Sequence, residues 1–217
     1  MTFSDNYVKC CSELDVVLFS NCYYLFVACV VAVEQESIKA NGHLIDKWGK
    51  IFDFDDFSHD EILSIEDVKV YGEHYRARCD MTDKQIKTFI KEMDRLWKGF
   101  FFTNKKELSK DDFINLMKQR YESNTTAFIE MVLLFESGWC KLIDLNGDKF
   151  LSKDEFIMDF NTGKLSNTKI DETFFYMYQP VNDRIPLDDM IMSFVLFFTE
   201  PGKSKPDIVF NGLNIGV

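Results

Sequence analysis

The chain has 217 residues, of which 46% are apolar, so it is long enough to bury one large core or two small ones. Its formal net charge is −11, which argues against nucleic acids and anionic membranes as partners and is compatible with cation binding. Six cysteines with no C-x-x-C pair and no zinc-ligand spacing indicate free thiols, and hence a reducing, cytoplasmic compartment.

Residues 16–33 form a nearly unbroken apolar run, at the lower length limit for a membrane-spanning helix. The residues before it carry Asp5, Glu13 and Asp15 against a single lysine, Lys9, which is the wrong charge for a signal peptide. We therefore favour a helix that packs on the globular body, where it could close a hydrophobic groove. A membrane or signal segment, and an atypical leader, remain as alternatives.

Residues 56–67 follow the frame of a twelve-residue EF-hand loop, in which oxygen ligands come from positions 1, 3, 5, 7, 9 and 12. Leu63 stands at the apolar position that can form a short β-bridge with a partner loop. The expected ligands are Asp56, Ser58, Asp60, the Ile62 carbonyl, Ser64 and Asp67.

The last ligand position of this first loop is an aspartate, whose side chain reaches the ion less easily than that of glutamate. A weaker or Mg²⁺-tolerant site is therefore expected. Two alternatives stay open here: a loop that begins at Asp53, and an acidic loop that binds no ion.

Residues 101–112 keep the same frame, with Leu108 at the bridge position and Asp112 at the end. Positions 1, 3 and 5, however, are Phe101, Thr103 and Lys105. A loop that lacks the leading acids and contains a cation should not bind calcium, so this second loop is expected to be structural.

Residues 144–155 match the frame best, and apolar residues at helical spacing lie on both sides of them. The expected ligands are Asp144, Asn146, Asp148, the Phe150 carbonyl, Ser152 through water, and both oxygens of Glu155. Position 6, where glycine is usual, is Lys149. A non-glycine residue with positive φ there costs about 1 kcal/mol, which should lower the affinity without removing the site.

Residues 178–189 form a fourth frame, in which Tyr178 and Pro180 replace the first two ligands. This loop is expected to be empty and to pair with the third, Ile185 against Leu151. The glycine- and proline-containing tail after it should fold back on the body.

The loop starts at 56, 101, 144 and 178 therefore define four helix-loop-helix repeats. We expect an all-α, compact fold of four EF-hands in two packed pairs, with an extra N-terminal apolar segment. The expected divisions are an extension over 1–40, a first pair over 41–122, a second pair over 123–199, and a tail over 200–217.

Residues 41–217 resemble the sarcoplasmic calcium-binding proteins and their relatives, which include calexcitins, coelenterazine-binding proteins and photoproteins. The resemblance rests on the long linker between the first two hands and on three short runs. These are Leu96-Trp97 with 113–118 around the second loop, 187–191, and Phe197-Phe198 before the tail. The resemblance implies a four-hand body with a continuous apolar interior, and a cytosolic calcium buffer.

We therefore expect a calcium-binding protein with one strong and one weaker site, and a dissociation constant of about 10⁻⁷ to 10⁻⁵ M at the third loop. The alternatives are a sensor that exposes an apolar groove to a target helix, and a carrier of a small apolar ligand. Methionines near the last pair suit a sensor, although core packing is the simpler explanation for them: Met158, Met177, Met190 and Met192. No phosphate-binding loop, H-E-x-x-H or G-x-S-x-G motif is present, so an enzyme is not expected.

Overall fold

The computed structural model describes residues 38–79, 81–102, 105–161, 167–202 and 207–215. The helix expected over 16–33 lies outside these ranges. The helices are α3 (Gly42–Asp55), α4 (Ile65–Arg78), α5 (Asp83–Trp97), the π-helical turn η1 (Lys98–Phe102), α6 (Lys110–Ser123), α7 (Thr125–Ile143), α8 (Lys153–Phe160), α9 (Thr168–Met177), α10 (Leu187–Thr199) and α11 (Ile208–Leu213). The strands are β1 (Ile62–Ser64), β2 (Glu107–Ser109), β3 (Phe150–Ser152) and β4 (Arg184–Pro186).

The helices that leave the first three loops start at a serine. The hydroxyls of Ser64, Ser109 and Ser152 accept hydrogen bonds from the backbone N–H groups of the first turns of α4, α6 and α8. Each serine thereby satisfies an amide that has no partner within the helix. The loop frame read from the sequence therefore also sets where each exiting helix begins.

Two short antiparallel sheets join the loops in pairs. Leu63 lies opposite Leu108 in the first sheet, and Leu151 lies opposite Ile185 in the second. All four side chains are buried, which fixes the register because a one-residue slip would turn them to solvent. The predicted pairing of Ile185 with Leu151 is confirmed.

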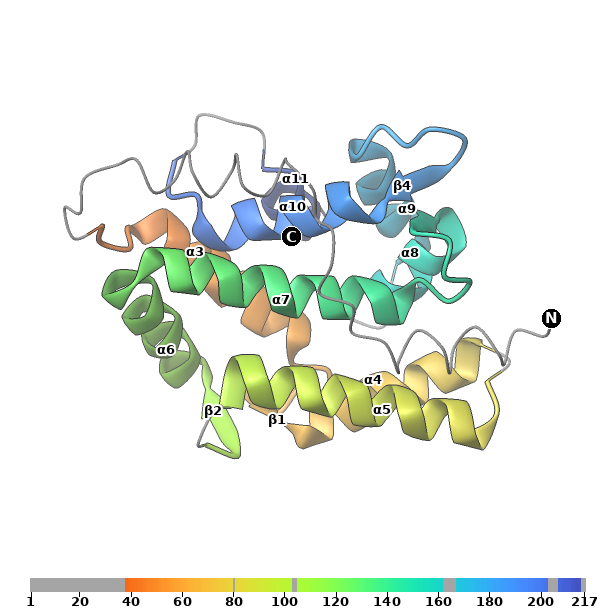
Figure 1. Ribbon diagram of the computed structural model, residues 1–217, viewed down its shortest axis with the longest axis horizontal. Helices are drawn as coiled ribbons and strands as arrows, with labels where there is room; N and C mark the ends of the chain where they lie inside the picture. The colour runs from red at the N-terminus through yellow and green to blue at the C-terminus, as the bar shows by residue number, and fades with distance from the viewer. Residues whose placement is uncertain (1–37, 80, 103–104, 162–166, 203–206, 216–217) are drawn as a thin grey trace.

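The two pairs share one aromatic core. Helix α7 lies between α5 and α10 and packs against both (Figure 1). Phe100 from η1 stacks on Phe135 of α7 at 4.5 Å and meets Phe198 of α10 edge-on at 5.8 Å. Aromatic contacts of this geometry add to the free energy of burying the rings. The predicted all-α, four-hand fold is confirmed.

The entry to the second loop differs from the expectation. The sequence frame places Phe101 at loop position 1, but the structure continues the helix through η1, and Phe100, Phe101 and Phe102 are all buried. A π-helical turn rotates successive side chains by a different angle than an α-helix. That rotation allows three consecutive phenylalanines to reach the core.

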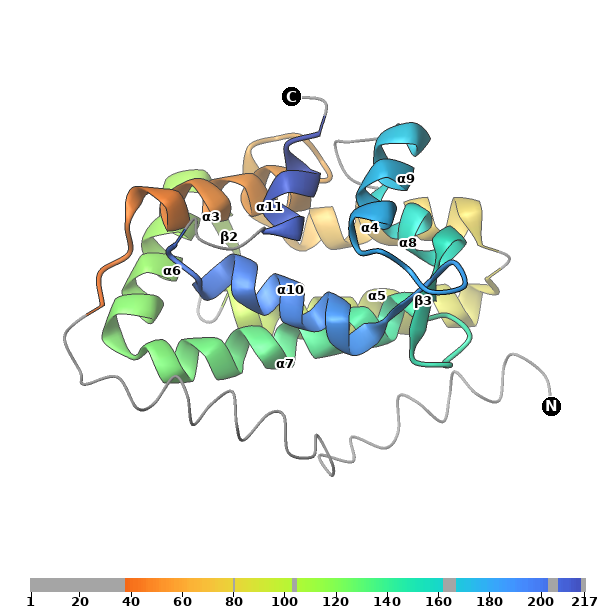
Figure 2. The same cartoon turned by 90° about the horizontal axis from the view of Figure 1, so that it is seen from above.

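The described residues 207–215 of the tail pack on the body. Helix α11 lies against α3 and α9 (Figure 2). Gly212 meets the Phe174 ring so closely that a Cβ atom would lie 2.3 Å from it. Any larger residue at this position would push α11 away from α9. In the part of the chain that the structure describes, no helix is long and apolar enough to cross a membrane.

Glu136 is one of the interior carboxyls that form no ion pair with a cation in the described ranges. Glu136 of α7 is buried, and burial, then the nearby Asp55 and Asp159, raise its pKa well above the ordinary value. The unfolded chain titrates at about 4.3, so the folded protein binds this proton more tightly than the unfolded one. Its contribution to stability is therefore lost as the pH rises above that value.

We expect Glu136→Gln to stabilise the protein near pH 8, where the folded state must keep this carboxyl protonated or desolvate its charge, and to have little effect near pH 4. Urea unfolding in EDTA at both pH values measures this. Glu130→Gln, at an exposed position of the same helix, is the matched control. Equal effects of Glu136→Gln at the two pH values would contradict the assignment of a desolvated carboxyl.

Candidate metal centre

The third loop is organised by Asp144, which directly follows α7. Its Oδ1 accepts hydrogen bonds from the backbone N–H groups of Gly147 at 2.8 Å and Asp148 at 3.2 Å. Its Oδ2 accepts from the N–H of Lys149 at 2.9 Å. The loop backbone is thus folded around the Asp144 carboxylate.

Glu155 closes the other end of the loop. Its Oε1 accepts from the N–H groups of Leu145 at 3.0 Å and Asn146 at 3.4 Å, and its Oε2 accepts from Ser152. Asp144 is 7% and Glu155 6% exposed, so both carboxylates are shielded from water where the loop meets α7 and α8. The Ser152 hydroxyl donates to Glu155 at 2.7 Å and also caps α8.

The remaining predicted side-chain ligands of this loop, Asn146 and Asp148, lie between these two ends. Asn146 Oδ1 accepts from the N–H of Asp148, and Asp148 Oδ1 accepts from that of Phe150, each at 2.9 Å. The backbone turns with positive φ at Gly147 (72°) and Lys149 (67°). The strained position expected at Lys149 is therefore present.

The first loop has a similar hydrogen-bond pattern, with fewer amides donating to its carboxylates. Asp56 accepts from the N–H groups of Asp60 at 3.2 Å and Glu61 at 3.1 Å, and Asp60 accepts from that of Ile62 at 2.9 Å. Asp67 accepts from Ser58 at 2.9 Å and Ser64 at 2.7 Å. Each predicted ligand residue of this loop donates or accepts one of these hydrogen bonds.

The loop register that starts at Asp56 fits this geometry better than one that starts at Asp53. Asp53 instead accepts from Lys110 of α6 at 2.7 and 2.8 Å. Positive φ occurs at His59 and Glu61, which are positions 4 and 6 counted from Asp56, as at Gly147 and Lys149 in the third loop. The two loops therefore turn at the same two frame positions.

Burial raises the pKa of Asp144 and of Asp67, although backbone hydrogen bonds oppose the shift in both. A desolvated carboxylate is stabilised by a nearby cation. All donors in both loops are oxygens, which suits a hard ion such as Ca²⁺ rather than a softer transition metal. The residues present therefore fit a calcium ion.

The three acidic ligand residues predicted for each loop are not all drawn to a single point. In the described ranges, no group of three or more His, Cys, Asp or Glu side chains is already arranged to hold a metal. In the third loop the reason is visible, because Asp148 forms an ion pair with Arg184 of the fourth loop. Asp144 and Glu155 are brought together, whereas Asp148 faces a neighbouring cation.

The second and fourth loops carry basic side chains at positions of the EF-hand frame, Lys105 at position 5 and Arg184 at position 7. Lys105 donates to Asp112 at 2.9 Å, so positions 5 and 12 of the second loop neutralise one another, and this hydrogen bond lowers the pKa of Asp112. Arg184 of the fourth loop reaches across the sheet to the third. The sequence reasoning missed this role of Arg184. The predicted pairing of Leu151 with Ile185 was a usable signal, because it sets Arg184 opposite Ser152.

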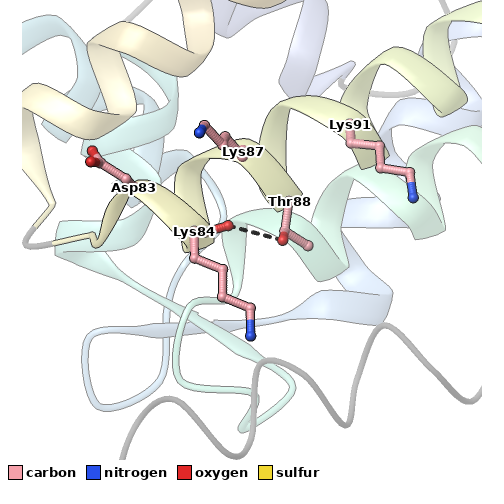
Figure 3. A pocket seen from close by; sticks show the side chains of 5 residues that line it. All are labelled: Asp83, Lys84, Lys87, Thr88 and Lys91. Carbon is pink, nitrogen blue, oxygen red and sulfur yellow. Dashed lines mark hydrogen bonds between the residues drawn. The ribbon is translucent and has the colours of Figure 1, made fainter.

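A surface hollow lies away from both loops. It is lined by Asp83, Lys84, Lys87, Thr88 and Lys91, all on α5 (Figure 3). Thr88 donates to the Lys84 carbonyl at 3.0 Å, and the three lysines extend from a solvated helix face. The hollow adds no ligand to the candidate metal centre.

No family model matches the chain. It is 23% identical over 169 residues to the sarcoplasmic calcium-binding protein of Mizuhopecten yessoensis, and the match spans 77% of this chain and 96% of that protein. The predicted resemblance to sarcoplasmic calcium-binding proteins is confirmed by this match.

Solved structures show a similar fold. The calcium-loaded apo form of the coelenterazine-binding protein from Renilla muelleri matches with a TM-score of 0.66 and 13% identity, over 76% of this chain and 92% of that one. The photoprotein mitrocomin from Mitrocoma cellularia matches with a TM-score of 0.61 and 15% identity, over 84% and 96%. At such identities these matches establish the fold alone.

Proposed function

We propose that this chain, an EF-hand protein similar to the sarcoplasmic calcium-binding proteins, binds calcium at its third loop and more weakly at its first. The observation that carries the proposal is the shared geometry of these two loops. In each, the carboxylates at positions 1 and 12 are buried and bound by loop amides. A bound calcium ion supplies the positive charge that these desolvated oxygens lack.

Each ligand residue has a distinct task in this proposal. Asp144 and Glu155 hold the two ends of the third loop, and Asn146, Asp148 and the Phe150 carbonyl complete the shell, with Ser152 acting through water. In the first loop the corresponding residues are Asp56, Ser58, Asp60, the Ile62 carbonyl, Ser64 and Asp67. Because Asp67 is shorter than glutamate, this site is the weaker and the more tolerant of Mg²⁺.

Buffering in the cytoplasm is the role that we favour over sensing. Met190 is buried, Met158 and Met177 are packed against the core, and Met192 is partly buried, so none of the four is an exposed side chain on the described surface. A sensor would expose apolar surface when the ion binds. Binding of a hydrophobic dye with and without calcium separates the two roles, and a buffer should show little difference.

Isothermal titration calorimetry of the intact protein should show two calcium-binding events, and Asp56→Ala should leave one. This substitution removes the carboxylate that accepts the Asp60 and Glu61 amides, so the first loop loses both a ligand and its organising acceptor. The stronger event, assigned to the third loop, should be unchanged. An unaltered titration would remove the first loop from the proposal.

A carrier of a small apolar ligand is the second candidate. The Trp97 Nε1–H is buried in the aromatic interior without a hydrogen-bond partner among the described residues. Buried polar groups are usually paired, so a ligand with an acceptor atom would stabilise this one. The similar fold of a coelenterazine-binding protein adds to this candidate. Reconstitution with an apolar chromophore, followed by absorbance, tests it.

A further inference from the structure

The side chain of Arg184 lies over the third loop although its backbone belongs to the fourth. Its guanidinium forms an ion pair with Asp148 Oδ2, and its Cζ atom lies 4.4 Å from the centroid of the Phe150 ring. Asp148 and Phe150 are loop positions 5 and 7, the side-chain and carbonyl ligands on one side of the candidate ion. Arg184 therefore contacts two ligand residues at once.

A tight turn gives Arg184 this direction. Val181 and Arg184 exchange two backbone hydrogen bonds of 3.2 Å across Asn182 and Asp183, and both of these central residues have φ of 54°. Positive φ at both positions is characteristic of a type I′ hairpin turn, whose twist matches the strands that it joins. The turn and the pairing with Ser152 hold the base of the Arg184 side chain in a defined register.

The contact does not occur in the first loop. None of the described lysines or arginines forms an ion pair with Asp56, Asp60 or Asp67. In the second loop Lys105 pairs with Asp112 of its own frame and does not cross to the first. Among the described residues, the second pair of hands therefore differs from the first, because a cation of one loop forms an ion pair with a predicted ligand of the other.

We propose that Arg184 is a tethered cation that occupies one side of the third-loop site in the ion-free protein and lowers its calcium affinity. This inference rests on calcium binding at the third loop. The guanidinium binds Oδ2 of Asp148, while Oδ1 accepts one hydrogen bond from the Phe150 amide and has a second lone pair for an ion. Arg184 can therefore stay bound and repel the ion, or move into solvent. Arg184 thereby sets the affinity, and it holds the empty fourth loop to the third when calcium is absent.

Two effects of removing Arg184 oppose each other. Loss of the ion pair leaves the Asp148 side chain less restrained. This effect should be small, because both side chains are 39% exposed and ion pairs at such positions contribute little to stability. Loss of a positive charge beside a doubly charged ion favours binding more strongly, because the interaction scales with the product of the charges. The net result should be tighter binding.

Calorimetric titration should show that Arg184→Gln binds calcium at the third loop about three- to tenfold more tightly than the parent at low salt, with a smaller difference at high salt. Arg184→Lys, which keeps the charge, should remain close to the parent. Arg95→Gln makes the same charge change in an exposed pair on α5 and is the matched control. An unchanged or weaker affinity in Arg184→Gln would overturn the proposal.

Thermal unfolding in EDTA provides a readout that needs no metal. Arg184→Gln should melt about 2 °C below the parent because the two loops lose their cross-link, whereas Arg184→Lys should lose less. If the parent binds no calcium, the proposed function fails, and this melt still decides whether Arg184 ties the loops together. Equal melting temperatures of parent and Arg184→Gln would refute the tether.

Discussion

Replacing Glu155 by glutamine should lower calcium affinity at the third loop by about two orders of magnitude, since the ion loses its bidentate carboxylate. Glutamine keeps one carbonyl oxygen to accept the Leu145 amide, and it removes a charge that is 6% exposed. The ion-free protein should therefore stay folded. The loss would appear in the calcium titration and not as a failure to fold.

The same variant should also show how much calcium binding at the third loop adds to the stability of the protein. At free calcium about a thousandfold above the dissociation constant, binding to the native state alone adds about 4 kcal/mol. For a chain of this size that corresponds to a rise in melting temperature of about 10 °C. EDTA should abolish most of this rise in the parent, and Glu155→Gln should show only the part contributed by the first loop.

Asp154→Asn is the matched control, because Asp154 is an exposed acid next to Glu155 at a position that supplies no ligand. It should bind calcium nearly as the parent does. If Glu155→Gln retained the parent's affinity, or if EDTA left the parent's melting temperature unchanged, the third loop could not be the calcium site.

Lys47→Ala should destabilise the fold by about 3–5 kcal/mol, the usual loss when one member of a buried ion pair is removed. Lys47 is fully buried in α3, and its Nζ lies 2.6 Å from Asp207 and donates to the Glu200 carbonyl at 2.9 Å. Asp207 caps α11 by accepting from the Phe210 amide. Without the lysine, Asp207 keeps a poorly solvated charge and α11 loses its attachment to α3.

Urea unfolding in EDTA measures this loss, and limited proteolysis of the tail should accelerate in parallel. Lys69→Ala, which breaks an exposed pair with Glu66, serves as the control and should change stability by less than about 1 kcal/mol. Adding Asp207→Asn to Lys47→Ala should recover part of the loss, because the unpaired charge is then gone. A Lys47→Ala variant as stable as Lys69→Ala would show that the tail is held by apolar contacts alone.

The local frame of each hand follows from spacing along the chain. Oxygen-bearing residues at alternate positions, an apolar residue at position 8 and a serine at position 9 were enough to predict the loops that start at 56 and 144. The strand pairs follow from the same frame, since Leu63 meets Leu108 and Leu151 meets Ile185. These features depend on backbone geometry within about twelve residues, which the order of residue types specifies directly.

The π-helical turn at Lys98–Phe102 was not predicted by this reasoning. The spacing of residues 101–112 predicts a loop that begins at Phe101, whereas the structure keeps Phe101 in a helix. The extra turn is stabilised by partners far along the chain, because Phe100 stacks on Phe135 and contacts Phe198. Tertiary packing here overrides the local frame.

The sequence by itself determined the repeat, the loop frames, the helix starts and the oxygen-rich composition of the candidate sites. The tertiary structure alone decided which acids have cationic neighbours: Asp53 pairs with Lys110, Asp148 with Arg184, and Glu136 with no described cation. The physical reason is distance along the chain. A ligand set is built from neighbouring residues on one turn of backbone, whereas its electrostatic surroundings come from side chains that only the packing of separate helices and loops brings near.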